Sequence, residues 1–477
     1  MYKLKIKKCF LLTIFLFLGK VYGQSQESFK NVSLNNLDAF LDPPKNWIIS
    51  GDAVADYTKT HDLQSIQGTG VVVDDFAKNN QMHLYTKEKF GDLELKLDFM
   101  MAKNSNSGVY LQGRYEIQLL DSWTKINPTA YDEGAIYPRR DQQRGSFEGV
   151  PPMMNVARAP GLWQHLDIKF RAPQFDKNGN KIKDARFEEV YLNGVLIQEG
   201  ANVTGPTTSG MFTDEEATGP VVLQGDHGPV AFKNIQYRKL SSVNDNVEGD
   251  NNATNRRPKN PVYINPQTKN YVLRSFMKYG DKKLTHMISI GSPSQVNFAY
   301  DLKQGAIFKI WRGQFLDVTD MWVGRGESQL ASPLGSVIIL NDAPAVAILH
   351  DENAPWPDSV SFDDLQDHGY VLNKERNPTF LYTIKGIDVK DSIVCEANGQ
   401  GILRKISITN PPENVYCRII NGKDITRLGE DLYSVNDKMF YIRIDNKYAP
   451  IIRNSPNGKE IIVKINGEQP VEYSFIW

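Results

Sequence analysis

The feature that most constrains the fold is a recurrence of short, alternating apolar segments separated by turn residues. From residue 93 onward these segments are LELKLDFMM, GVYLQG, YEIQLL, HLDIKFRAP, EEVYLNGVLI, PVVLQG and VAFKNIQYRKL, with Gly, Asn, Asp and Pro between them. Alternation with a period of two is typical of half-buried β-strands, and strands at this spacing are typical of a sandwich or jelly roll. Convincing long amphipathic helical patterns are absent from the sequence. We therefore predict an all-β fold.

The chain is long enough for two domains. Its 477 residues exceed what one compact core usually holds. Residues 241–260, SSVNDNVEGDNNATNRRPKN, contain almost no large apolar side chain and have the composition of a linker. We expect a jelly-roll sandwich over residues 35–240 and a second β-rich domain over residues 261–477. No period repeats across the halves, which excludes a solenoid or propeller.

The second domain is expected to be an accessory module for binding or docking, with a carbohydrate among its candidate ligands. Trp311, Arg312 and Trp322 lie in an aromatic, Arg- and Gly-rich run there. They are candidate sugar contacts, and a structural aromatic corner is the alternative.

The first 23 residues have the pattern of a secretory signal. Four lysines among residues 3–8 precede an apolar run at 10–18, and a small-residue pattern follows at 21–23. The run is too short to span a bilayer. We predict cleavage after residue 23 and a mature protein that is periplasmic or extracellular. Cleavage removes five lysines, which leaves 50 Lys and Arg against 56 Asp and Glu, a net charge of about −6. Nucleic acid is therefore not an expected partner.

Two cysteines, Cys395 and Cys417, remain after the predicted cleavage. In an exported protein a disulfide between them is allowed, and it would close a loop of about 22 residues worth roughly 3 kcal/mol. Two buried free thiols are the alternative, and the sequence leaves both open.

Several common catalytic motifs are missing from the sequence. HExxH, CxxC and G-x-S-x-G do not occur, so common zinc sites and serine hydrolases are unsupported. The closest glycine cluster, Gly324-Arg325-Gly326, lacks the third glycine of a dinucleotide site, so an oxidoreductase is unsupported as well. The run Asp176–Asn180, DKNGN, resembles a calcium loop, but its glycine is misplaced and the twelfth position is Phe187 instead of Glu. An Asn-Gly hairpin tip is the predicted structure.

The stretch 104–123, NSNSGVYLQGRYEIQLLDSW, contains the most informative polar pattern. Glu116 and Gln118 occupy alternate positions of an evident strand, so their side chains share one face. The intervening residues are apolar and belong to the opposite face. This pattern predicts a polar floor backed by core, which is the ordinary way in which a β-sandwich builds a sugar site.

Further polar groups stand near glycine-rich strand ends. The candidates are Asn106, Arg114, Asp121, Tyr137, Gln224 and His227, with Trp123 as an aromatic stacking face. Mixed amide, carboxylate, imidazole and guanidinium groups suit a polyhydroxylated ligand. Asp121 is five residues from Glu116, so it joins the same face only if a bulge intervenes or the strand has already ended.

Each candidate also has a structural interpretation. Glu116 could pair with Arg114 on a solvent-facing strand, and His227 could cap a turn. Laminarinase-like jelly-roll glycosidases use a strand E-x-D-x-E for double displacement. Gln118 cannot ionise, so this strand lacks one of the carboxylates that the double-displacement mechanism requires.

Six separated motifs resemble one family, the 3-keto-disaccharide hydrolases, also named the 3-keto-glucoside 1,2-lyase/3-keto-2-hydroxy-glucal hydratase domain. The motifs lie at residues 106–110, 115–121, 163–164 with 170–173, 192–195, 219–224 and 232–235. The resemblance covers residues 35 to 240, and it departs from the expected pattern by one inserted residue in Gly225-Asp226-His227-Gly228. It implies a concanavalin-like jelly roll acting on glycosides already oxidised at C3.

The resemblance gives the candidate residues their expected roles. A C3 carbonyl acidifies the C2 proton, so a single base can start β-elimination of the C1 substituent, and water then adds back. We expect Glu116 to be this base and His227 to be the acid. The remaining expected site residues are Asn106, Arg114, Gln118, Tyr137, Gln224 and Trp123 for binding, and Asp121 as a third catalytic group.

Several alternatives stay open at this stage. A divalent cation held by Glu116, Asp121 and amide oxygens is another way to stabilise charge on the C3 oxygen. The expected ligand is a 3-keto-glycoside or another saccharide, and a sugar 3-dehydrogenase is the expected upstream partner. A lectin-like sandwich that binds unoxidised saccharides without turnover is the alternative function.

Overall fold

The computed structural model describes residues 27–78, 81–241, 260–323 and 328–477. The predicted signal over 1–23 and nearly all of the predicted linker lie outside these residues. The described part consists of antiparallel sheets, which confirms the predicted all-β class. Its helices are one turn of α-helix, α1 (Thr319–Trp322), and a 3-10 turn at Asn446–Tyr448. Neither is long and apolar enough to cross a membrane.

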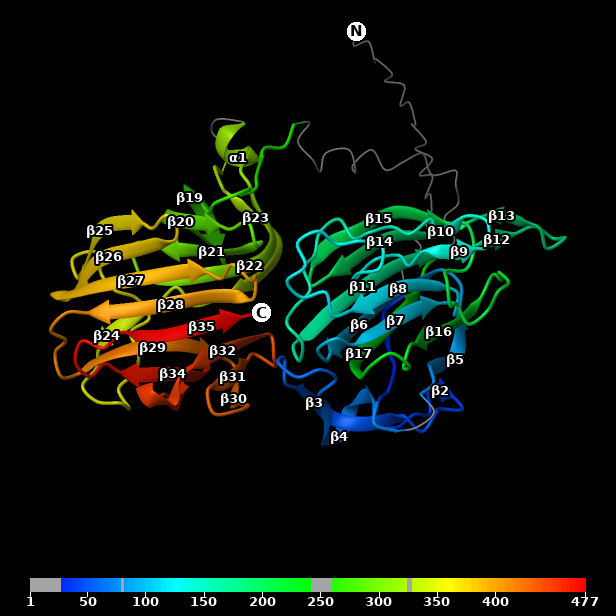
Figure 1. The fold of residues 1–477 in the computed structure, drawn as a ribbon, viewed down its shortest axis with the longest axis horizontal. Coiled ribbons are helices and arrows are strands. Elements are labelled where there is room, and N and C mark those ends of the chain that lie inside the picture. Colours follow the sequence, from blue (N-terminus) through cyan, green and yellow to red (C-terminus); the bar gives the residue numbers. More distant parts are fainter. Residues whose placement is uncertain (1–26, 79–80, 242–259, 324–327) are drawn as a thin grey trace, which may run out of the picture.

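The first domain contains two large sheets (Figure 1). The eight-stranded sheet has the spatial order β15 (Val195–Val203), β14 (Ala185–Leu192), β11 (Trp163–Arg171), β6 (Leu93–Met101), β17 (Val230–Lys239), β4 (Leu63–Asp74) and β3 (Trp47–Ala55), with β1 (Lys30–Asn31) paired to β17. The five-stranded sheet has the order β2 (Phe40–Leu41), β5 (Leu84–Phe90), β16 (Gly219–Leu223), β7 (Asn106–Leu111) and β8 (Tyr115–Leu120). Neighbours in space are often distant in sequence, as in a jelly roll.

Two short hairpins extend this domain. They are β9 (Arg139–Asp141) with β10 (Gly145–Phe147), and β12 (Gln174–Phe175) with β13 (Lys181–Lys183). The second hairpin contains the calcium-like DKNGN run at its tip. There the Asp176 carboxylate accepts the backbone N–H groups of Asn178 and Asn180, each at 2.8 Å. The predicted hairpin tip is thus confirmed.

The core of the first domain lies between its two sheets. Leu97 and Phe99 of β6 meet Leu111 of β7 and Ile117 of β8 there, and all four are fully buried. Tyr115 and Leu119 belong to the same core. The alternation predicted for β8 therefore holds, with the apolar positions facing inward.

The second domain contains three sheets. The six-stranded sheet has β18 (Tyr263–Ile264), β22 (Ala306–Asp317), β21 (Val296–Asp301), β20 (Lys282–Gly291) and β19 (Tyr271–Tyr279), with β23 (Ser332–Ile339) paired to β22. The four-stranded sheet has β24 (Val346–Ile348), β29 (Val415–Gly422), β34 (Gly458–Lys464) and β33 (Ile451–Ser455). The eight-stranded sheet has β25 (Leu365–Leu372), β26 (Pro378–Ile384), β27 (Ile387–Cys395), β28 (Gly401–Ile408), β35 (Val471–Ile476), β32 (Phe440–Ile444), β31 (Leu432–Val435) and β30 (Ile425–Arg427).

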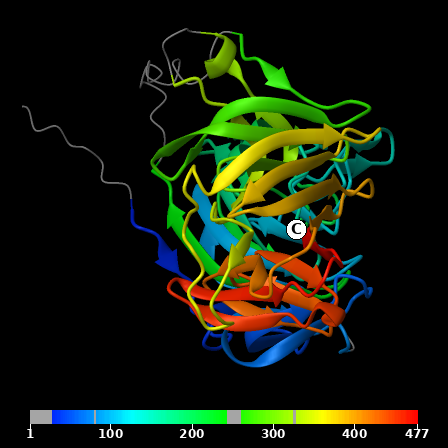
Figure 2. The ribbon, with the colours of Figure 1, turned by 90° about the vertical axis from the view of Figure 1, so that its left-hand side faces the viewer.

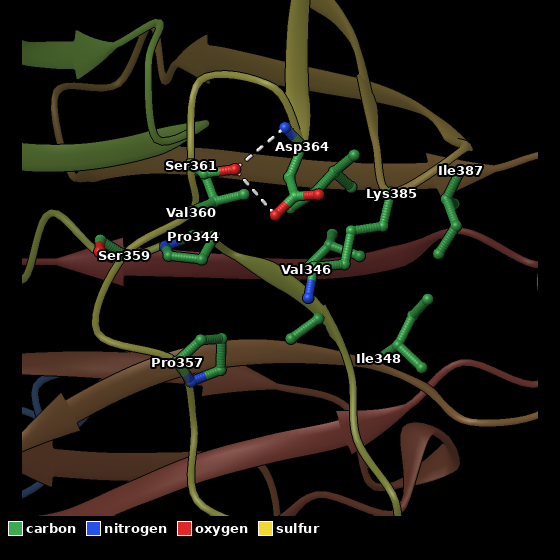
Figure 3. Close-up of a pocket in the computed structure, with 12 residues that line it drawn as sticks. Pro344, Val346, Ile348, Pro357, Ser359, Val360, Ser361, Asp364, Lys385 and Ile387 are labelled. Carbon is green, nitrogen blue, oxygen red and sulfur yellow. Dashed lines mark hydrogen bonds between the residues drawn. The ribbon is translucent and has the colours of Figure 1, made fainter.

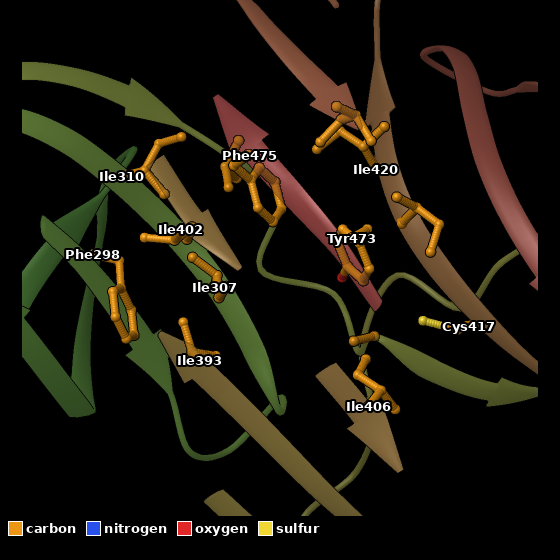
Figure 4. Close-up of a cluster of buried hydrophobic side chains, with 14 of the residues drawn as sticks. Phe298, Ile307, Ile310, Ile393, Ile402, Ile406, Cys417, Ile420, Tyr473 and Phe475 are labelled. Carbon is orange, nitrogen blue, oxygen red and sulfur yellow. The ribbon is translucent and has the colours of Figure 1, made fainter. Parts of the chain in front are cut away.

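Aliphatic and aromatic side chains from these sheets form one large core (Figure 4). Phe298 and Ile310 from the six-stranded sheet meet Ile402 and Phe475 from the eight-stranded sheet. Cys417 of β29 borders the same core. Burial of these apolar surfaces stabilises the second domain.

Cys395 and Cys417 are free thiols in this structure, and both are buried. Burial raises the pKa of each thiol to about 12. Of the two alternatives left open by the sequence, the structure therefore contains the buried thiols. At neutral pH both are protonated and unreactive.

The two domains lie side by side, with Trp477 at their boundary (Figure 1), and Figure 2 views the second domain in front of the first. The Trp123 indole of the first domain donates to the backbone oxygen of Trp477 at 2.8 Å. Its ring meets Tyr57 edge-on at 5.8 Å, and Tyr57 stacks on Tyr441 of β32 at 5.4 Å. Arg312 also donates to the Trp477 oxygen, at 2.7 Å. An aromatic cluster thus joins the domains.

This cluster corrects the expected role of Trp123. We expected a stacking face for sugar, but the ring packs against the second domain's core and its N–H is already bonded. The two candidates Trp311 and Arg312 are buried as well, and the Trp311 indole donates to the Phe315 carbonyl at 3.0 Å. For these two residues the structural alternative is correct. Trp322 is 55% exposed.

Trp123→Ala is expected to destabilise the protein by about 3 kcal/mol, since it removes a ring and a hydrogen bond from a packed interface. Urea unfolding followed by tryptophan fluorescence measures this loss. Trp322→Ala is the matched control and is expected to change stability by less than about 0.5 kcal/mol. A normal unfolding midpoint together with a raised KM for saccharide would return Trp123 to the binding site.

Candidate functional site

The candidate site is built on the outer face of β7 and β8, away from the sandwich core. The two strands pair in register from Asn106 opposite Leu120 to Leu111 opposite Tyr115, without a shift. Directly opposed residues share a face, so Tyr110 lies beside Glu116 and Gly108 beside Gln118. The predicted pair of polar residues thus gains a tyrosine and a glycine as neighbours.

Glu116 is only 2% exposed, although it faces away from the core. Its backbone N–H donates to the Thr207 hydroxyl at 3.2 Å, and its carbonyl accepts from the Tyr137 N–H at 3.1 Å. Segments beyond the β8 edge therefore flank it. Its carboxylate lies over β7 at Gly108, where a Cβ atom would overlap Oε1 and lie 3.1 Å from Cδ. A glycine here leaves the space that the carboxylate occupies.

Burial is the main cause of an unusual ionisation at this position. Loss of hydration raises the pKa of Glu116 to about 8; a hydrogen bond from Tyr110 opposes this rise and the nearby Asp226 charge adds to it. Burial likewise raises the pKa of the Tyr110 hydroxyl, which keeps it a hydrogen-bond donor. A carboxyl that titrates near neutrality is suited to take up and return a proton.

Two amides lie beside this carboxyl. The Gln118 amide satisfies its surroundings when its nitrogen donates to Glu116 Oε1 at 3.1 Å and to the Ser107 carbonyl at 3.2 Å. The side chains of Gln118 and Asn106 are 3.1 Å apart. The sequence predicted that Gln118 shares a face with Glu116, and Asn106 of the neighbouring strand lies beside Gln118.

A carboxylate–imidazole pair lies at the end of β7. The Nδ1 atom of His227 is 2.6 Å from Oδ1 of Asp226, and the His227 carbonyl accepts from the Asn106 N–H at 3.1 Å. The imidazole is 56% exposed. Because Asp226 holds Nδ1, the proton that His227 can exchange is the one on Nε2.

Gln224 and His83 support this loop. Gln224 donates from its backbone to Gly108 at 3.0 Å, and its Nε2 lies 3.4 Å from Nδ1 of His227. The Gly225 N–H donates to Nδ1 of His83 at 3.3 Å. Burial lowers the pKa of His83, which keeps it a neutral acceptor.

Tyrosine rings occupy the β8 edge of the site. Tyr137 is half-buried, and its ring meets the exposed ring of Tyr131 edge-on at 5.5 Å. Burial and the Glu116 charge both raise the pKa of Tyr137. These rings offer the apolar surface that sugar rings pack against.

Asp121 does not join Glu116. β8 ends at Leu120, so Asp121 lies beyond the strand and its side chain is held in the adjoining turn. Its Oδ2 accepts the backbone N–H of Asn104 at 2.8 Å, in a turn where Asn104 has a φ of 58°. The expectation of a third catalytic group is corrected to a turn-stabilising carboxylate.

Arg114 is also placed differently from the expectation. Its guanidinium donates to the Asp214 carboxylate at 2.7 Å and to the carbonyls of Asp214 and Gln112 at 2.6 and 3.0 Å. The ring of Phe212 covers it, 4.7 Å away. Arg114 therefore fixes the 212–214 loop instead of binding a ligand directly, and it does not pair with Glu116.

The expected cation site made from Glu116 and Asp121 is not formed, because the Asp121 carboxylate lies beyond the end of β8 and accepts the backbone N–H groups of Asn104 and Trp123. In the described ranges, no three His, Cys, Asp or Glu side chains converge on a common metal position. A metal site here would have to be built mainly from other oxygen ligands.

Sequence reasoning did not select Tyr110, Asp226 and His83 as site residues. Tyr110 has a usable signal, since it lies an even number of residues from Asn106 on the same predicted strand. Asp226 adjoins the predicted His227. His83 has no sequence signal, because it approaches Gly225 across 142 residues.

A separate pocket lies in the second domain (Figure 3). It has a volume of about 70 Å³ and is lined mainly by apolar side chains such as Val346, Pro357 and Ile387. Its Ser361 hydroxyl donates to the Asp364 carboxylate at 2.8 Å. The pocket lacks the converging amide and acidic groups found around Glu116.

Comparison with known proteins concerns this first domain. Residues 43–238 match a family model described as a 3-keto-alpha-glucoside-1,2-lyase-like domain. The N-terminal sandwich is a 3-keto-alpha-glucoside-1,2-lyase-like domain. This match concerns the first domain and supports a carbohydrate-active enzyme. No curated protein matches the chain.

Three solved structures resemble the chain only distantly. A Parabacteroides distasonis ATCC 8503 protein described as a "putative glycosyl hydrolase" has 23% identity over 48% of this chain and 97% of its own, with a TM-score of 0.32. A second "Putative glycosyl hydrolase" from the same organism has 21% identity over 45% of this chain and 100% of its own, with a TM-score of 0.30. The receptor binding domain of botulinum neurotoxin D has 9% identity over 92% of this chain and 98% of its own, with a TM-score of 0.23. The sheet topology, not these scores, carries the fold assignment.

Proposed function

We propose that the chain is an exported enzyme that cleaves 3-keto-glycosides by removing the C2 proton and eliminating the C1 substituent. The observation that carries the proposal is Glu116, a nearly inaccessible carboxyl whose pKa burial raises to about 8, on a face lined by hydrogen-bonding amides. Such a group is suited to abstract a proton next to a ketone.

In the first step, the ionised Glu116 takes the proton from C2 and the electron pair moves into the C3 carbonyl. The developing C3 oxyanion needs donors that are already in place. Gln118 and Tyr110 donate to the Glu116 carboxylate and orient it, and Asn106 supplies an amide N–H group for the oxyanion. The strands hold all three before substrate binds, so little reorganisation is needed.

In the second step, the C1–O bond breaks as the C1=C2 double bond forms. His227, held at Nδ1 by Asp226, gives a proton from Nε2 to the departing oxygen. Water adding at C1, with return of the Glu116 proton to C2, completes net hydrolysis. A pair of carboxylates is unnecessary, because elimination proceeds without an oxocarbenium ion. A sugar 3-dehydrogenase acting upstream would supply the ketone.

The purified protein is expected to release p-nitrophenol from the 3-keto form of p-nitrophenyl glucoside and none from the unoxidised glucoside. Absorbance at 400 nm measures release, and calorimetry measures binding of both compounds. Binding of the unoxidised glucoside without turnover of either compound would favour the lectin-like alternative and reject the enzyme.

A further inference from the structure

A buried cluster of oxygen atoms lies beneath the 225–227 loop, outside the reaction proposed above. Its centre is Nδ2 of Asn46, the residue before β3. This nitrogen lies 2.8 Å from Oδ1 of Asp74, 3.0 Å from the Met82 carbonyl, and 3.4 Å from both Gln81 Oε1 and the Gly225 carbonyl. Asn46 and Asp74 are fully buried.

The hydrogen bonding of this cluster is incomplete. An amide nitrogen carries two hydrogens, and four oxygens surround it. Among the described residues, Oδ1 of Asn46 and Oδ2 of Asp74 have no hydrogen-bond partner. Each belongs to a side chain whose other polar atom already lies in the cluster. Buried oxygens without partners are rare in native proteins because each one is costly.

The charge of the cluster is also incomplete. Across the described residues, no lysine or arginine pairs with Asp74. Asp75 and Asp226 lie close to Asp74 and add further negative charge. The cluster therefore combines surplus negative charge with surplus acceptor oxygens, and a bound cation would satisfy both.

We propose that this cluster is a calcium-type cation site. Calcium takes six to eight oxygen ligands from carboxylates, carbonyls and amides in a flexible geometry. Asp74, Gln81 and the Met82 and Gly225 carbonyls supply four, and Asn46 supplies a fifth once its amide turns to present Oδ1. Waters complete the shell. Oxygen-only ligands favour calcium over zinc or copper.

The site has a consequence for catalysis that rests on the proposed function. Gly225 contributes a ligand and directly precedes Asp226 and His227, so the cation would fix the loop that presents the acid. A Cβ atom at Gly225 would lie 2.7 Å from the Trp47 ring and 2.8 Å from the Met82 carbonyl. The residue inserted relative to the family pattern thus falls at a position where the packing requires glycine.

The test uses the full protein freed of metal with EDTA. Adding Ca²⁺ is expected to raise the melting temperature by about 5 °C, since the ion binds the folded state alone. Tb³⁺ is expected to luminesce when Trp47 is excited, because the Trp47 indole donates to the ligand carbonyl of Met82 at 2.7 Å. Ca²⁺ should displace this emission. No melting shift and no emission would overturn the site.

Variants separate this site from other calcium-like sequences. Asp74→Asn should lose both signals, and Gln81→Ala, at a half-buried side chain, should weaken binding about tenfold. Asp176→Asn, in the DKNGN hairpin tip, is the matched control and should keep both signals. Wild-type Ca²⁺ affinity in both Asp74→Asn and Gln81→Ala would reject the site.

Activity distinguishes the site from the proposed function. Calcium binding with an unchanged cleavage rate would reject only the link to His227. Cleavage by a protein that binds no calcium would reject the site and leave the proposed function intact.

Discussion

Glu116→Gln is expected to lower kcat for cleavage of a 3-keto-glycoside by about 10³-fold, because the amide cannot accept the C2 proton. The substitution keeps the shape and hydrogen-bonding length of the side chain, so KM should change by less than about threefold. Initial rates of aglycone release, measured with wild type and variant at the same pH, check this result. A variant that retains a tenth or more of wild-type kcat would show that another group is the base.

The same residue sets the expected pH dependence. The base must be ionised to act, and burial raises the pKa of Glu116 to about 8. Wild-type kcat/KM should therefore rise about tenfold per pH unit below pH 8 and level off above it.

The pH dependence of stability provides the folding control for this variant. The folded pKa of Glu116 lies above the ordinary value of 4.5, so the folded state binds the proton more tightly than the unfolded chain. Stability is therefore lost as the pH rises from 4.5 to 8. Glutamine cannot ionise, so the melting temperature of the variant should exceed that of wild type at pH 8 and approach it at pH 5. An inactive variant with this profile is folded.

The strand pattern explains why much of the first domain was predictable. Alternation in β8 separates Ile117 from Glu116 and Gln118, and burial of an apolar face determines which side each occupies. Local pattern also identified the hairpin tip at Asp176–Asn180. Where side-chain direction follows from a regular strand, the sequence was sufficient to predict which face each residue occupies.

The errors arose where position depends on distant parts of the chain. Trp123 bonds to Trp477 across 354 residues, and no local pattern indicates that a second domain covers this ring. Arg114 bonds to Asp214 across 100 residues. The place of Asp121 depended on a bulge or on where the strand ends, and β8 ends one residue before it, at Leu120. Polar side chains near a predicted site are therefore candidates for scaffold bonds as well as ligand contacts.

Gly108→Ala is expected to lower kcat about 10²-fold, because the new methyl group would occupy the space of the Glu116 carboxylate. A displacement of about 1 Å at a reacting group can cost this much. The backbone itself tolerates alanine, since Gly108 lacks the positive φ of many other glycines. Initial rates measure the loss. Gly429→Ala, where a Cβ atom meets open space, is the matched control and should be fully active.

A double-mutant cycle makes this prediction specific to the carboxylate. In the Glu116→Gln background the base is already absent, so adding Gly108→Ala should cost less than about threefold. If the reductions in kcat caused by Glu116→Gln and Gly108→Ala multiplied instead, Gly108→Ala would impair other parts of the site and would not act through Glu116. If Gly108→Ala alone stayed within twofold of wild type, the carboxylate would have room to work from another position, and the space left at Gly108 would have no catalytic role.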